Sequence, residues 1–163
     1  MEYLELFQQL HNQNIRYMIC GGLAVNIYGI PRMTADIDIL LDFEEVNVSK
    51  FENSMKLLSY ISTVPVSLQT MLDKSVREKI IKEKSMIAYS FYNSRSGVMN
   101  LDVLIDVPFS FDVMWEKREI RKQDAIEINL VSLEHLIEMK TYSNRKQDTD
   151  DVLLLSKILN RGK

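Results

Sequence analysis

The residues best suited to chemistry are two aspartates that stand two positions apart in an apolar run. Asp36 and Asp38 alternate with isoleucines in the segment Asp36-Ile37-Asp38-Ile39. On a β-strand successive side chains point to opposite faces, so both carboxylates would share one face and the isoleucines the other. Neighbouring carboxylates repel each other unless a cation lies between them, and Mg²⁺ prefers carboxylate oxygens together with substrate phosphates. The spacing indicates a divalent-metal site, although an edge strand can also expose alternate acids without any function.

A third acid lies in a second apolar run, at residues 100–105. Asp102 has apolar neighbours on both sides, and a carboxylate there is costly to bury unless it is paired or bound to metal. Asp106 would share the same strand face, but it stands just before Val107-Pro108, where the strand should end. We prefer Asp102 as the third site residue, and the sequence leaves the choice between the two open.

Glycines and a loop precede the paired acids. Gly21-Gly22 follows a short strand candidate and precedes a helix candidate, a place where backbone can approach a phosphate closely. An isolated Gly-Gly is also a plain tight turn. Arg32 and Thr34 come directly before Asp36, and Arg32 could bind a triphosphate or simply neutralise the two acids. No Walker-type or Gly-x-Gly-x-x-Gly motif is present.

The C-terminal part offers two basic candidates for phosphate binding. Lys140 shares a helical stripe with apolar residues, so it would either extend to water along its stem or reach into a site. Arg145 is the better bidentate phosphate partner. Asp148 and Asp151 fit the acidic first turn of a helix, and an ion pair of either one with Arg145 is a further alternative.

These residues need a framework of alternating elements. Periodicity predicts a mixed α/β (α+β) domain with a small mixed sheet, flanking helices and C-terminal helices, spanning 1–163 as one domain. The expected helices are 2–13, 23–28, 46–60, 68–84 and two after residue 133. The expected strands are 16–20, 36–41, 85–92 and 98–105, the last two joined by Asn-Ser-Arg-Ser-Gly, with a short helix and one or two strands in 109–131.

Composition sets outer limits on function. The formal net charge is −3 over 163 residues, so no global attraction to nucleic acid is indicated, and we interpret the basic face of the 68–84 segment as solvated charge. No apolar stretch reaches the roughly 18 residues of a membrane span. Cys20 is the only cysteine, which excludes an internal disulfide and favours a cytoplasmic location.

Taken in order, these motifs resemble the nucleotidyltransferase superfamily, whose fold is that of polymerase beta-like nucleotidyltransferases. Its pattern is Gly-Gly or Gly-Ser, an interval, Asp-x-Asp, and a later acid on an adjacent strand. Gly21-Gly22, Asp36, Asp38 and Asp102 occupy those places. Within the superfamily the chain looks most like the small AbiEii-like group, which includes toxins of toxin–antitoxin and phage-defence systems. That likeness rests on Arg32-x-Thr34-x-Asp36-Ile37-Asp38, on Lys140, and on Arg145-x-x-Asp148 with Asp151.

The resemblance implies an enzyme that uses Mg²⁺ or Mn²⁺, held by Asp36, Asp38 and Asp102, to transfer a nucleotide from a nucleoside triphosphate to an acceptor hydroxyl. Gly21, Gly22, Arg32, Thr34, Lys140 and Arg145 would bind the nucleotide and its phosphates. It further implies tRNA or a protein as acceptor, and an antitoxin or other protein partner. Alternatives are a non-catalytic regulator or nucleotide-binding module of the same fold, a small-molecule (antibiotic) nucleotidyltransferase, and a scaffold domain whose acids only solubilise the surface.

Overall fold

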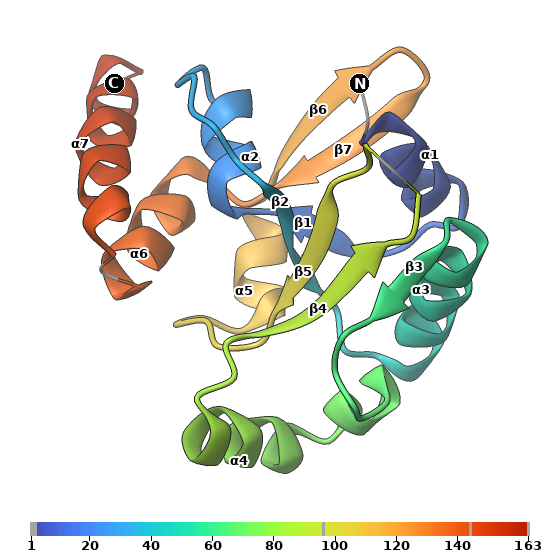
Figure 1. Cartoon of the computed structure of the whole chain (residues 1–163). Coiled ribbons are helices and arrows are strands. Elements are labelled where there is room, and N and C mark those ends of the chain that lie inside the picture. Colours follow the sequence, from blue (N-terminus) through green and yellow to red (C-terminus); the bar gives the residue numbers. More distant parts are fainter. Residues whose placement is uncertain (1–2, 96, 144, 163) are drawn as a thin grey trace.

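A mixed sheet runs through the middle of the part of the chain that the computed structural model describes, residues 3–95, 97–143 and 145–162 (Figure 1). Its seven strands stand in the order β3-β4-β5-β2-β1-β7-β6. β2 lies parallel to β5 and β1 parallel to β7, whereas the other neighbouring pairs are antiparallel. The strands are β1 (Tyr17–Ile19), β2 (Asp36–Leu41), β3 (Tyr60–Ser62), β4 (Ala88–Asn93), β5 (Asn100–Leu104), β6 (Glu119–Gln123) and β7 (Ile126–Leu130). The predicted mixed sheet is confirmed, and β4 and β5 pair antiparallel as predicted, while Ser96 of their predicted Asn-Ser-Arg-Ser-Gly connection lies outside the described residues.

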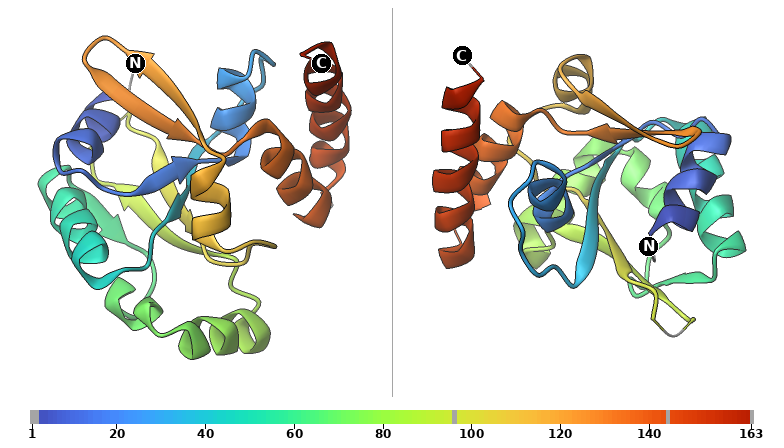
Figure 2. Two further views of the ribbon diagram at one scale, coloured as in Figure 1. Left: turned by 180° about the vertical axis from the view of Figure 1, so that it is seen from behind. Right: turned by 90° about the horizontal axis from the view of Figure 1, so that it is seen from above.

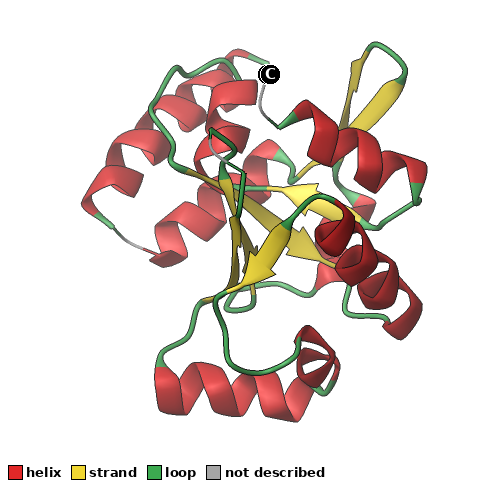
Figure 3. Cartoon of the chain, turned by 45° about the vertical axis from the view of Figure 1, so that its right-hand side comes forward, coloured by secondary structure: helices red, strands yellow, loops and turns green. Residues whose placement is uncertain are grey.

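Helices cover both faces of this sheet (Figures 2 and 3). They are α1 (Leu4–Asn12), α2 (Gly21–Ile27), α3 (Glu45–Leu57), the short 3-10 helix η1 (Leu68–Leu72), α4 (Lys74–Lys84), α5 (Phe111–Glu116), α6 (Leu133–Ser143) and α7 (Lys146–Arg161). α1 and α3 pack together on one side, while α2 packs on β2 and α6 on the other, with α7 against α6. None of the described helices is long and apolar enough to cross a membrane.

The core explains why β2 can carry two acids. Ile37 and Ile39 are fully buried, whereas Asp36 and Asp38, which alternate with them along the strand, remain partly exposed, as strand alternation predicts. Aromatic rings fill the space beside the sheet. Phe7 stacks on Tyr17 with ring centroids 6.1 Å apart, and Phe51 meets Phe91 edge to face at 5.9 Å. One face of β2 is therefore fixed by packing, which leaves the other for the site.

The predicted continuous helix over 68–84 is wrong. η1 ends at Leu72, and Asp73 has an extended backbone with φ −76° and ψ 113°. The Asp73 carboxylate accepts hydrogen bonds from the N–H groups of Ser75 at 2.8 Å and Val76 at 3.4 Å, so it caps a new helix, α4. The apolar stripe continues across this break, so periodicity alone could not reveal it.

Two smaller differences affect the ends of elements. α2 begins at Gly21 rather than after Gly22, so both glycines belong to its first turn. Residues 60–62 form the edge strand β3, where the sequence predicted the end of a helix. A strand of three residues is too short to show a two-residue alternation.

Candidate active site

β2 and β5 bring the three predicted acids to one wall of a cavity. In the parallel pairing of these strands, Asp38 lies opposite Asp102 and Asp36 lies opposite Asn100. Paired residues on neighbouring strands point to the same face, so Asp36, Asp38 and Asp102 face the same way. All three are partly exposed and line a cavity of about 1160 Å³. We call these three carboxylates the acidic wall.

The structure separates the two candidates for the third acid. Asp106 lies beyond the end of β5, and although it lines the same cavity, its Oδ1 accepts a hydrogen bond from the Tyr142 hydroxyl at 3.0 Å. Asp102 lies within β5, in register with Asp38 on one side and with Ser90 of β4 on the other. This geometry favours Asp102 as the partner of the β2 acids, while its chemical role stays a prediction.

The crowding of negative charge affects Asp38 most. Burial, then repulsion from Asp102 and Asp36, raises the pKa of the Asp38 carboxyl to about 6, although a hydrogen bond from the Gly22 N–H and the nearby Lys140 oppose that rise. A cation that approaches this carboxylate stabilises its charged form. The acidic wall therefore favours positive charge in the cavity.

The fit of a metal ion to the acidic wall rests on donor chemistry. Carboxylate oxygens are the ligands that Mg²⁺ and Mn²⁺ prefer. Within the described ranges, however, no three His, Cys, Asp or Glu side chains are gathered closely enough to form a ready metal site. The Asp38 carboxylate is turned toward the backbone at the start of α2, close to Gly21. Binding one ion jointly would require the carboxylates to turn toward it.

The two glycines are required by close contacts at this wall. Gly21 has a positive φ of 60°, and a Cβ there would lie 1.9 Å from Asp38 Oδ2, which no side chain can occupy. A Cβ on Gly22 would lie 2.7 Å from Thr34 Oγ1. Both glycines line the cavity, as their predicted phosphate-binding role needs. Because Asp38 lies against Gly21 and Thr34 against Gly22, the glycines also leave room for the β2 acids and for the loop before them.

The loop at residues 31–35 is held at several points. The Arg32 N–H donates to Asn26 Oδ1 at 2.8 Å, and the Thr34 hydroxyl donates to the backbone oxygen of Asp36 at 3.0 Å. The Arg32 guanidinium forms its ion pair with Asp151 of α7. The sequence offered neutralisation of Asp36 and Asp38 as one role for Arg32, and its observed ion pair corrects that expectation.

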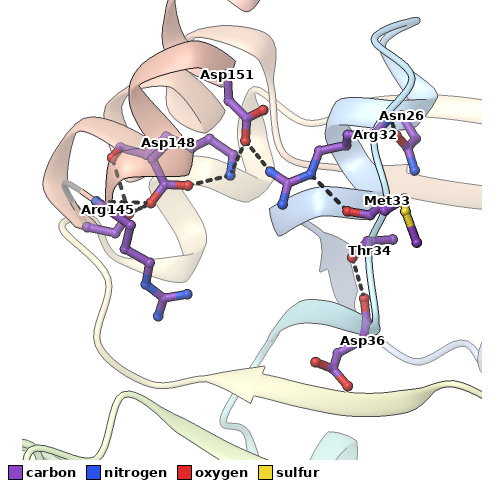
Figure 4. A network of polar contacts seen from close by, with 10 residues as sticks. Asn26, Arg32, Met33, Thr34, Asp36, Arg145, Asp148 and Asp151 are labelled. Carbon is purple, nitrogen blue, oxygen red and sulfur yellow. Dashed lines mark hydrogen bonds and ion pairs between the residues drawn. The ribbon is translucent and has the colours of Figure 1, made fainter.

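Lys140 lies between two acids of α7. Its Nζ is 2.8 Å from Asp148 Oδ1 and 2.8 Å from Asp151 Oδ2, and these side chains are no more than 10% exposed. Asp148 also accepts hydrogen bonds from the Ser143 hydroxyl and from the Arg145 N–H at 3.3 Å. Burial would raise the pKa of Asp148, but the hydrogen bonds from Lys140 and Ser143 outweigh it and lower that pKa. Figure 4 shows this network, and we call Arg32, Lys140, Asp148 and Asp151 the balanced cluster because it holds two cations and two carboxylates.

Arg145 is placed differently from the balanced cluster. The ion pair of Arg145 with Asp148 or Asp151, which the sequence left open, is not formed in the described part of the chain: these carboxylates pair with Lys140, and Asp151 also with Arg32. The Arg145 side chain is exposed, lines the cavity and extends toward the sheet in Figure 4. Of the predicted basic residues, it is the one most free to meet an anion.

Sequence reasoning missed four polar residues of the cavity as site candidates, Ser90, Tyr142, Ser143 and Gln147. Ser90 had a usable signal, because the predicted hairpin places it near Asp102 once the register is known. Tyr142 and Ser143 lie at the end of α6, beyond the apolar stripe that drew attention to Lys140. Their contacts with Asp106 and Asp148 depend on how α6 is docked, which periodicity does not give.

Comparison with known proteins finds likeness in structure only. No family model matches the chain, and no curated protein matches it. The crystal structure of ANT(2″)-Ia in complex with adenylyl-2″-tobramycin superposes with a TM-score of 0.56 at 11% identity, covering 95% of this chain and 86% of that one. An antigenic nucleotidyltransferase-like protein from Paracoccidioides brasiliensis superposes with a TM-score of 0.50 at 19% identity, covering 92% and 71%. With its seven-stranded mixed sheet and flanking helices, this chain therefore has the nucleotidyltransferase fold.

Proposed function

We propose that the chain is a metal-dependent nucleotidyltransferase that moves a nucleoside monophosphate from a nucleoside triphosphate to an acceptor hydroxyl. The observation that carries this proposal is the register of β2 and β5, which aligns Asp38 with Asp102 on one wall of a cavity. The fold of the two solved structures supports the same reaction class, since one of them holds an adenylylated product.

The reaction needs one bond made and one broken at the α-phosphorus. The acceptor oxygen attacks in line, its proton passes to Asp102, and the bond between the α-phosphorus and the bridging oxygen breaks as pyrophosphate leaves with the electron pair. Positioning and charge neutralisation supply most of the acceleration in this chemistry. We assign positioning of the phosphates to Arg145 at the cavity edge, with Arg32, Lys140, Thr34 and the Gly21-Gly22 backbone behind it.

The metal belongs to the acidic wall. Asp36, Asp38 and Asp102 would hold Mg²⁺ or Mn²⁺, which supplies positive charge to the phosphate oxygens and lowers the pKa of the attacking hydroxyl. This assignment is supported by the donor chemistry of the wall and by the raised pKa of Asp38, which shows how strongly its surroundings oppose uncompensated negative charge.

The acceptor is the finer part of the proposal. The Arg32-x-Thr34-x-Asp36 pattern and the Lys140, Arg145, Asp148 and Asp151 set favour the AbiEii-like group, hence tRNA or protein as acceptor in the cytoplasm and an antitoxin-like partner. A small-molecule acceptor is the second candidate. It is favoured by the likeness to the aminoglycoside-bound ANT(2″)-Ia structure, of which this chain covers 86%.

One labelling experiment tests all of these. The chain is incubated with each α-³²P-labelled nucleoside triphosphate and Mg²⁺, in separate reactions with total tRNA, with protein, with aminoglycosides and with no added acceptor. We expect label on one acceptor class, lost in EDTA and in an Asp36→Ala/Asp38→Ala double variant. Asp112→Ala/Asp150→Ala, which removes two exposed aspartates, is the matched control.

If calorimetry finds Mg²⁺-dependent triphosphate binding but no label moves, the non-catalytic regulator is favoured. The absence of binding would refute the role given to the acidic wall.

A further inference from the structure

Asp151 holds two cations at once. Its Oδ2 lies 2.8 Å from Lys140 Nζ, and the same oxygen accepts from the Arg32 guanidinium. The side chain of Asp151 is 8% exposed, that of Lys140 9% and that of Arg32 19%. Three segments far apart in the sequence meet there: the loop before β2, α6 and α7 (Figure 4).

Asp151 itself does not line the cavity, whereas both of its cationic partners do. Arg32 and Lys140, rather than Asp151 itself, are therefore the groups that can contact a nucleotide in the cavity. Asp148 differs in this respect, because it lines the cavity and also receives Ser143 and the Arg145 N–H.

The loop that Asp151 anchors has little room to move. Thr34 lies so close to Gly22 that a Cβ there would stand 2.7 Å from its hydroxyl oxygen, and the Arg32 N–H is fixed by Asn26. The loop leads straight into Asp36 of the acidic wall. The Arg32–Asp151 ion pair is thus a cross-link between α7 and the segment that carries the β2 acids.

Charge balance makes this cross-link sensitive to loss. Without Asp151, Lys140 would keep Asp148 as its one carboxylate partner among the described ion pairs, and a largely buried cation that loses a partner is costly. Arg32 would lose its ion-pair partner altogether in the described structure. Both cations would then be free to leave the positions from which they face the cavity.

We propose that Asp151 is a positioning residue for the proposed transferase: it sets Arg32 and Lys140 against the cavity and fixes the 31–35 loop relative to Asp36, without touching the nucleotide. This inference rests on the proposed function for its kinetic consequence. Its structural half, the anchoring of the loop, can be tested independently of any activity.

The decisive comparison is Asp151→Asn against Asp150→Asn. Both changes remove one negative charge from α7, but Asp150 is exposed and Asp151 is buried in the balanced cluster. We expect Asp151→Asn to raise KM for the triphosphate by about tenfold or more, because loss of precise placement weakens phosphate contacts, with a smaller change in kcat. Asp150→Asn should behave as the unaltered chain. An Asp151→Asn protein that is folded at the assay temperature and keeps the KM of the control would overturn the proposal.

Two further measurements separate positioning from general damage and from failure of the proposed function. In an Arg32→Gln background, Asp151→Asn should add much less to KM than it does alone, whereas equal increments would contradict action through Arg32. Hydrogen exchange should be faster over residues 31–36 in Asp151→Asn but not in Asp150→Asn. If the unaltered chain neither binds nor turns over triphosphate, the proposed function fails, yet this exchange result still decides whether Asp151 anchors the loop. If Asp151→Asn does not fold, Arg32→Gln removes the same cross-link and takes its place in the exchange measurement, where unchanged exchange over residues 33–36 would overturn the anchoring.

Discussion

Two groups of charged residues, of which all but Asp151 line the same cavity, differ in how their charge is compensated. The acidic wall carries three carboxylates of one sign on two adjacent strands, and burial together with their mutual repulsion raises the pKa of Asp38. The balanced cluster holds two cations and two carboxylates from a loop and two helices, linked by direct ion pairs. Within the described residues, no ion pair joins the acidic wall to a cation of the chain, whereas the balanced cluster is already neutral. The comparison suggests that the wall provides the chemistry and the cluster the placement.

The largest effect on the transfer rate should come from replacing Asp102, the third carboxylate of the acidic wall. Asp102→Asn should lower the transfer rate by about a hundredfold or more, the typical contribution of a group that accepts the acceptor proton. Asp106→Asn should leave the rate within about threefold, because Asp106 lies beyond β5 and is hydrogen-bonded to Tyr142. Steady-state rates with the labelled triphosphate measure both. The reverse order of effects would assign the third acid to Asp106.

Breaking the balanced cluster should act on stability instead. Lys140→Met leaves two buried carboxylates with Arg32 as their one remaining cation in the cluster, so we expect a loss of about 3 kcal/mol in the free energy of unfolding. Lys146→Met removes an exposed lysine at the start of α7 and should change it by less than about 0.5 kcal/mol. Urea denaturation compares the two. Equal midpoints for both variants would mean that the cluster contributes nothing net.

The pH dependence of the free energy of unfolding tests the charge of the acidic wall. Because the folded-state pKa of Asp38 is raised from 3.8 to about 6, the folded chain loses stability as pH rises through this interval. Asp38→Asn removes that cost and keeps a side chain of nearly the same size, so in EDTA it should stabilise the fold by about 2 kcal/mol at pH 8. The gain should shrink below pH about 6 and vanish near pH 4. Thermal unfolding across this range is the measurement, and a gain that is independent of pH, or shared by Asp150→Asn, would contradict it.

The smallest expected effect concerns the cation outside the cluster. Arg145→Gln should raise KM for the triphosphate by up to about fivefold, as expected for a partly solvated charge contact. Stability should be unaffected, since the Arg145 guanidinium forms no ion pair within the described residues. Arg161→Gln, at the far end of α7, is the matched control for both measurements. An Arg145 variant that loses stability but keeps its KM would show that Arg145 stabilises the fold and does not bind the triphosphate.

The acidic wall was predictable because its signals are local. Alternation in 36–39 places Asp36 and Asp38 on one face, and the apolar run around Asp102 marks a second strand. The parallel register that aligns Asp38 with Asp102 is a long-range pairing that no local pattern specifies. The continuous helix over 68–84 failed for a different reason: Asp73 is a helix-capping residue type, but the apolar stripe runs past it.

The balanced cluster was predictable only in part. The position of Lys140 on an apolar stripe left two outcomes open, extension to water along its stem or reach into a site. In the structure the whole side chain is buried, and its ammonium pairs with Asp148 and Asp151. The partners could not be predicted, because Arg32 and Asp151 stand 119 positions apart in the sequence. Their contact depends on how α6 and α7 dock beside the loop, which is a property of tertiary packing rather than of any local motif.

The parallel register of β2 and β5 also determines where the chain can change length. Residues added to the connection at 94–99, outside both strands, leave the phase of β5 untouched, so Asp102 would still face Asp38. A single residue inserted between Asn100 and Asp102 would exchange the two faces of the remaining strand and turn the carboxylate toward the core. Among chains built on this plan, the number of residues from Asp38 to the third acid should vary freely. The acid should always occupy a strand position whose side chain points to the cavity face. That position within the strand identifies this residue better than the number of residues that separate it from Asp38.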